Sequence, residues 1–88
     1  MKAIIYTKNY CSFCKKAKDL LNDKNIPYEE YIIDVFGKGK RILNENQHWA
    51  TSGELLEKRP SSRTVPQIWL DDKYIGGFTE LRDLLDTE

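Results

Sequence analysis

Residues 2–33 have the sequence KAIIYTKNYCSFCKKAKDLLNDKNIPYEEYII, in which two apolar runs flank one amphipathic segment. The first run, residues 2–6, predicts a buried strand. Residues 12–24 have a helical stripe along one face, whose members are Phe13, Ala17, Leu20, Leu21 and Lys24. Residues 28–33 are aromatic and β-branched, so they predict a second strand. Strand, helix and strand in this order indicate a unit with two parallel strands.

The second half of the chain predicts further short elements. Ile42, Leu43 and Trp49 indicate a helix across roughly residues 40–50, and the capping box Thr51-Ser52-Gly53-Glu54 predicts another helix after it. Together these give two short helices or one broken helix.

The C-terminal part predicts two strands and a helix. Residues 67–70 and 73–75 are apolar runs joined at Asp71-Asp72, which is typical of a hairpin. Gly76-Gly77 ends the sheet, and leucines at helical spacing over residues 81–85 predict the last helix. The predicted order is therefore β-α-β-α-β-β-α, an α/β fold with a four-stranded mixed sheet flanked by helices.

Length and composition limit the class of protein. At 88 residues we expect a single domain over residues 1–88. The net charge is zero, whereas nucleic-acid binders usually carry a basic excess. Apolar runs are far shorter than the roughly 20 residues that span a bilayer, so we expect no membrane partner. The start of the chain enters a predicted strand without a visible signal peptide, which predicts a cytoplasmic protein.

The two cysteines, Cys11 and Cys14, have the spacing C-x-x-C. A structural zinc site needs four ligands, and His48 is the one other good soft ligand, so no metal site is predicted within one chain. A redox pair, half of a metal site shared by two chains, and coincidence remain open. A C-x-x-C pair inside a strand–helix–strand pattern favours redox chemistry.

The spacing gives the two thiols different environments. Cys11 lies at the predicted helix start, where free backbone N–H groups and the helix dipole stabilise a thiolate. Thiols in such motifs have pKa values of roughly 3.5–7.5 instead of about 8.5. Cys14 lies one turn further along, on the edge of the apolar stripe, where burial keeps it protonated. We therefore predict that Cys11 attacks and Cys14 resolves.

Three motifs make the chain resemble the glutaredoxin family. They are Lys8-Asn9-Tyr10-Cys11-Ser12-Phe13-Cys14, Thr64-Val65-Pro66 and Gly76-Gly77-Phe78-Thr79-Glu80-Leu81. The order and spacing of the three motifs, together with the pattern of strands and helices, extend the resemblance over nearly the whole chain. The enlarged middle segment, residues 36–60, resembles that of some phage glutaredoxins.

The resemblance implies a thioredoxin fold, a cis Val65–Pro66 bond and glutathione as co-substrate. It implies that Lys8 meets the glycyl carboxylate and that Thr79 and the first turn of the last helix bind the γ-glutamyl carboxylate. Glu80 would take the γ-glutamyl amine, and Gly77 would allow close approach. The full set of glutathione-binding residues implied by the resemblance is Lys8, Phe13, Thr64, Val65, Pro66, Gly77, Phe78, Thr79 and Glu80.

The implied activity is reduction of protein disulfides and glutathione mixed disulfides by a monomer, as part of electron transport and cell redox homeostasis. Ribonucleotide reductase is the protein partner that the resemblance implies. Ser12 replaces the proline common after the first cysteine, which resembles members that hold a [2Fe-2S] cluster between two protomers. In that alternative Cys11 of each protomer and two glutathiones are the ligands. A thioredoxin recharged by a flavoenzyme is a third reading, disfavoured because the motif Trp-Cys-Gly-Pro-Cys is absent.

Overall fold

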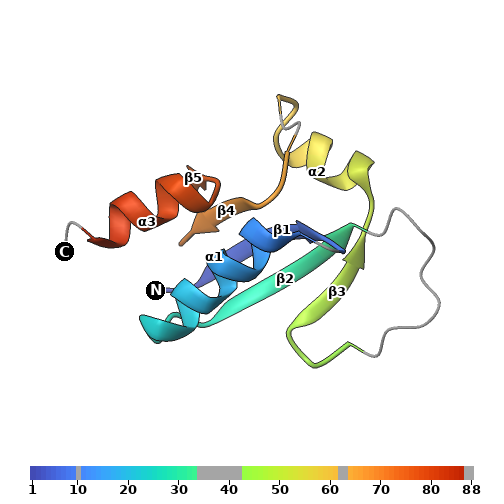
Figure 1. Cartoon of the computed structure of the whole chain (residues 1–88). Coiled ribbons are helices and arrows are strands. Elements are labelled where there is room, and N and C mark those ends of the chain that lie inside the picture. Colours follow the sequence, from blue (N-terminus) through green and yellow to red (C-terminus); the bar gives the residue numbers. More distant parts are fainter. Residues whose placement is uncertain (10, 34–42, 62–63, 87–88) are drawn as a thin grey trace.

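The computed structural model describes residues 1–9, 11–33, 43–61 and 64–86. Its centre is β1 (Ala3–Lys8), which pairs in parallel with β2 (Tyr28–Ile33) on one side. On the other side β1 pairs antiparallel with β4 (Gln67–Leu70). The sheet order is β3-β2-β1-β4-β5, so the predicted mixed sheet is confirmed and belongs to the thioredoxin fold (Figure 1).

The predicted four strands become five within the described residues, because β3 (Gln47–Ala50) replaces part of the helix expected over roughly 40–50. β3 pairs in parallel with the outer edge of β2, with Gln47 opposite Glu30. Before it, Asn46 N donates to Asn44 Oδ1 at 3.2 Å. Asparagine side chains that bind the backbone compete with helix formation, which explains why the helix prediction was wrong here. Residues 34–42 lie outside the described part of the chain.

The strand β5 (Lys73–Gly76) forms the predicted hairpin with β4. Asp71 and Asp72 have positive φ values of 48° and 68°, the conformation of a tight two-residue hairpin turn. The predicted sheet end at Gly76 is confirmed.

Three helices lie against this sheet in the described residues: α1 (Ser12–Asp23), α2 (Ser52–Lys58) and α3 (Phe78–Asp86). α1 ends one residue before the predicted Lys24, and Asn25 then turns the chain with φ 57°. α2 begins at the predicted capping box, where Thr51 Oγ1 accepts from Glu54 N at 3.1 Å. None of the helices in the described ranges is long and apolar enough to cross a bilayer.

Each face of the sheet has its own apolar core. Neighbouring residues of β1 point to opposite faces, so Ile5 packs with α1 and α3 while Tyr6 packs with α2. The α1–α3 core contains Ala3, Ile5, Ala17, Leu21, Ile26, Ile68, Leu70, Leu81 and Leu85. Through this core the sheet fixes the N-terminal ends of α1 and α3 relative to the start of β4.

Candidate active site

Cys11 and Cys14 form a disulfide at the N-terminus of α1, with Cα atoms 5.3 Å apart. Cys11 is the N-cap residue, in an extended conformation with φ −108° and ψ 108°. Its Sγ accepts from Cys14 N at 3.2 Å, so a backbone N–H of the first turn points at this sulfur. Cys11 is partly exposed, whereas Cys14 is 2% exposed. The predicted difference in surroundings between the two sulfurs is therefore confirmed.

The segment Thr64-Val65-Pro66 lies directly beside the disulfide. The Val65–Pro66 peptide bond is cis, as the resemblance implied. Cys11 Sγ lies 4.0 Å from Val65 O. The segment precedes β4, whose first residue, Gln67, pairs with Tyr6, so the segment lies outside the pairing of β4 with β1.

Gln67 was not predicted as a site residue, but it supports this segment. It is buried, and its Nε2 donates to Thr64 O at 2.8 Å. Tyr74 OH donates to Gln67 Oε1, so the amide has partners on both sides. Gln67 thus fixes the backbone before Pro66. The signal in the sequence is a polar residue that opens an otherwise apolar strand.

An open pocket of about 190 Å³ borders this segment. It brings together eight of the nine predicted glutathione-binding residues, namely Phe13, Thr64, Val65, Pro66, Gly77, Phe78, Thr79 and Glu80. Phe13 is 54% exposed, and its ring centroid lies 6.1 Å from that of Phe78. The two rings form an apolar wall whose open side faces solvent.

The N-terminus of α3, which begins with Phe78, also borders this pocket. Gly77 N donates to Glu80 Oε1 at 2.7 Å, so Glu80 satisfies one of the free N–H groups of the first turn. A Cβ atom on Gly77 would lie 3.3 Å from Pro66 O, so glycine lets α3 approach the Pro66 backbone closely. Thr79 lies within the helix, not at its N-cap, and is exposed.

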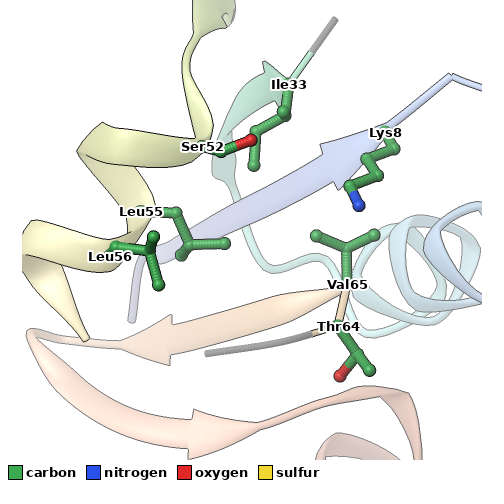
Figure 2. A pocket seen from close by; sticks show the side chains of 7 residues that line it. All are labelled: Lys8, Ile33, Ser52, Leu55, Leu56, Thr64 and Val65. Atoms are coloured by element: carbon green, nitrogen blue, oxygen red, sulfur yellow. The ribbon is translucent and has the colours of Figure 1, made fainter. Parts of the chain in front are cut away.

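Lys8 is the one predicted binding residue that does not line the first pocket. It lines a second pocket of about 110 Å³ with Ile33, Ser52, Leu55, Leu56, Thr64 and Val65 (Figure 2). Thr64 and Val65 border both pockets. The two pockets therefore meet at the segment beside Cys11, one bordered by the N-terminus of α3 and the other by the ammonium of Lys8.

No group of three or more His, Cys, Asp or Glu side chains in the described residues is arranged to hold a metal ion. His48 stacks instead on Tyr31, with ring centroids 5.0 Å apart, so it packs on the sheet surface. A [2Fe-2S] cluster needs Cys11 from two protomers, so that alternative stays a prediction.

Comparisons with known proteins agree with this geometry. A family model described as Glutaredoxin matches residues 3–75. Glutaredoxin 1 of Rickettsia conorii is 35% identical over 81 residues, which cover 92% of this chain and 69% of that protein. Glutaredoxin 3 of Escherichia coli is 38% identical over 77 residues, covering 88% and 77% of the two chains. The structure of glutaredoxin 1 from Francisella tularensis, complexed with cacodylate, superposes with a TM-score of 0.71 at 33% identity and covers 98% of this chain and 93% of that one.

Proposed function

The chain belongs to the glutaredoxin family of thiol–disulfide oxidoreductases, and from this premise we propose that it uses glutathione to reduce protein disulfides and glutathione mixed disulfides. The observation that carries the proposal is the position of Cys11 Sγ, 4.0 Å from Val65 O, because Val65 borders one pocket at the N-terminus of α3 and another beside the ammonium of Lys8. Glutathione has a thiol between two carboxylates, so its charges match this arrangement.

Cys11 is the proposed nucleophile. In the reduced protein its thiolate attacks one sulfur of the target disulfide, a new S–S bond forms, and the other sulfur leaves as a thiolate that takes up a proton. Cys14 then attacks Cys11 when the target is a protein disulfide, which regenerates the intramolecular disulfide. Two glutathione molecules reduce that disulfide and leave as oxidised glutathione.

The first pocket is the proposed site of the γ-glutamyl group. Its carboxylate would approach the free N–H groups of the first turn of α3, near Thr79. Glu80 has one carboxylate oxygen bound to Gly77 N, and its other oxygen is available to the γ-glutamyl ammonium. Phe13 and Phe78 would cover the methylene groups of the ligand.

The backbone of Val65 is the proposed partner of the cysteinyl residue, which would pair with it as an added strand, supported by Thr64 and Pro66. Lys8 would then pair with the glycyl carboxylate on the other side of this segment (Figure 2). The ligand thus spans both pockets with its sulfur at Cys11.

The proposed setting is the cytoplasm, where glutathione keeps thiols reduced. The protein would act there as a monomer, passing electrons from glutathione to disulfide-bearing proteins. Ribonucleotide reductase, which the family resemblance implies, is the proposed protein partner.

A glutathione-coupled assay with two matched serine variants tests the proposal. Cys14→Ser should keep reduction of a glutathione mixed disulfide and lose most reduction of a protein disulfide. Cys11→Ser should lose both activities. If Cys14→Ser loses everything while Cys11→Ser stays active, the assigned roles are wrong; if the wild type turns over neither substrate with glutathione, the proposed function is wrong.

A further inference from the structure

We propose that the pocket beside Lys8 takes an apolar side chain from the residue that follows the reacting cysteine of the substrate. The protein would then prefer disulfides of peptides that end in cysteine and an apolar residue over those of glutathione. The inference rests on the proposed function, because it uses the same Cys11 chemistry and the same direction of the bound peptide.

Four of the seven residues that line this pocket are apolar, and Lys8, Ser52 and Thr64 form its polar part. Leu55 and Leu56 of α2 lie on one side in Figure 2, and Val65 and the stem of Lys8 lie on the other. Ile33 borders it at the end of β2. Leu56 is 44% exposed, so part of its surface is in water when the pocket is empty. Glycine has no side chain that would cover this surface.

The volume indicates one side chain and not a whole ligand. The pocket measures about 110 Å³, against roughly 300–1,000 Å³ for sites that enclose a small molecule. Covering the exposed part of Leu56 with a leucine or similar side chain removes apolar surface from water on both partners. The ammonium of Lys8 remains available for the terminal carboxylate of the same residue.

The position along the peptide follows from the backbone beside Cys11. If the substrate cysteine pairs through its backbone with Val65, its sulfur lies near Cys11, since Cys11 Sγ is 4.0 Å from Val65 O. The next residue of an extended peptide is about 3.3 Å further along. Since Val65 borders both pockets, one step past the reacting cysteine leads from the first pocket to the second.

The reaction is the same exchange with a different peptide. Cys11 thiolate attacks the cysteine sulfur of the peptide, the bond between this sulfur and its partner thiol breaks, and the partner leaves and takes up a proton. One glutathione then attacks the peptide sulfur, releases Cys11 as a thiolate and forms a glutathione–peptide disulfide. The glutathione sulfur is oxidised from a thiol to a disulfide, the sulfur of the released partner is reduced from a disulfide to a thiol, and the peptide sulfur stays in a disulfide throughout.

The test compares two mixed disulfides that share the same partner thiol. One carries γ-Glu-Cys-Gly and the other γ-Glu-Cys-Leu, and kcat/KM is measured for each with the full chain and a fixed glutathione concentration. We expect the leucine peptide to react about tenfold faster, because an added apolar side chain that packs against Leu55 and Leu56 gives discrimination of this order. Converting the leucine carboxylate to an amide should lower kcat/KM for the leucine peptide, because the amide cannot form an ion pair with the Lys8 ammonium.

Two variants of Leu56 show whether this pocket causes the preference for the leucine peptide. Leu56→Ser should reduce the ratio of the two kcat/KM values to about two or less, and Leu56→Met should restore it. Leu84→Ser is the matched control, because Leu84 is 40% exposed on α3 and does not line this pocket, and it should leave the ratio unchanged.

The outcomes separate this inference from the proposed function. Turnover of the glycine peptide with no faster turnover of the leucine peptide overturns the inference and leaves the proposed function intact. A preference that Leu56→Ser and Leu84→Ser reduce equally, or an amide as fast as the acid, also overturns it. Failure of both peptides to react overturns both.

Discussion

Lys18 of α1 and Glu30 of β2 form an ion pair beneath the helix that begins after Cys11, with Lys18 Nζ 3.0 Å from Glu30 Oε2. Glu30 is 2% exposed, and it also accepts from Thr7 Oγ1 at 2.7 Å and from Gln47 Nε2 at 2.8 Å. One buried carboxylate therefore connects α1, β1 and β3. The contact fixes the helix that carries both cysteines to three strands of the sheet.

Removing the positive partner should destabilise the protein. Lys18→Met leaves the Glu30 carboxylate buried without its cation, and we expect the free energy of unfolding to fall by about 2–3 kcal/mol, below the full range for buried pairs since the Lys18 side chain is 21% exposed. Urea unfolding at neutral pH measures this loss.

The matched control is the surface pair Lys15–Asp19 on the same helix. Its N–O distance of 3.1 Å is nearly the same, but both side chains are largely exposed. Lys15→Met should lower the free energy of unfolding by about 0.5 kcal/mol or less. Equal losses for the two variants would show that the Lys18–Glu30 contact is worth no more than a surface pair.

The same carboxylate makes stability depend on pH. Burial acts to raise the pKa of Glu30, but hydrogen bonds from Gln47, Thr7 and Lys18 and the charge of Lys18 outweigh it, so the pKa lies below its ordinary value. A lowered pKa in the folded state contributes stability that is complete above the unfolded pKa of about 4.3 and is lost as the pH falls through the folded pKa.

Comparing wild type with Glu30→Gln isolates this contribution. The variant has no titrating group at this position, so the difference in free energy of unfolding should be largest near neutral pH and shrink as the pH falls from about 5 towards 3. Urea midpoints at several pH values measure it. A difference that stays constant over this range would mean that ionisation of Glu30 does not stabilise the fold.

Gly76, between β5 and α3, should tolerate no side chain. Its φ is 129°, and a Cβ atom would lie 2.9 Å from Glu80 Cβ and 2.7 Å from Glu80 Oε1. Gly76→Ala should therefore lower the free energy of unfolding by about 2–3 kcal/mol, through backbone strain and displacement of the Glu80 carboxylate from Gly77 N. Thermal unfolding measures the change.

At Gly53 we expect the same substitution, to alanine, to stabilise the protein. It lies in the first turn of α2, where the nearest atom to an added Cβ is Thr51 Oγ1 at 3.7 Å. Gly53→Ala should raise the free energy of unfolding by about 0.5–1 kcal/mol, because alanine loses less backbone entropy in a helix. Similar effects of the two substitutions would contradict the conformational argument at Gly76.

The sequence pattern predicted correctly those helices and turns that depend on contacts between residues close together in the sequence. The stripe of α1, the capping box at Thr51 and the Asp71-Asp72 turn each depend on residues a few positions apart, and all three are confirmed. β3 was missed because it forms by pairing with the edge of β2, and Asn44 and Asn46 prevent the helix that apolar spacing alone suggests.

For the site too, local patterns predicted some features, and others depend on tertiary packing. Motif spacing predicted that Cys11 lies at a helix start, but the buried charge on Glu30 was not visible, since Glu29 and Glu30 are identical neighbours. The register of β2 against β1 decides which of them faces α1. Likewise, the family resemblance implied Lys8 as a binding residue, but that it lines a separate pocket depends on how α2 packs.

The position of Cys11 Sγ beside Cys14 N, at 3.2 Å, leads to a prediction for the reduced protein. In Cys14→Ser, the N–H of residue 14 and the positive end of α1 should stabilise the Cys11 thiolate, so we expect a thiol pKa of roughly 3.5–7.5 against about 8.5 for a free cysteine. The pH dependence of iodoacetamide alkylation measures it.

Cys11→Ser is the matched control, because it leaves Cys14 as the one thiol. Cys14 is 2% exposed and one turn inside α1, so it should react far more slowly than Cys11 at neutral pH. A Cys11 thiol that titrates no lower than a free cysteine would mean that the helix start does not stabilise the thiolate. Cys11 would then need its substrate, held at Val65 and Lys8, to make it reactive, and the rate would depend on the target's charge more than on pH.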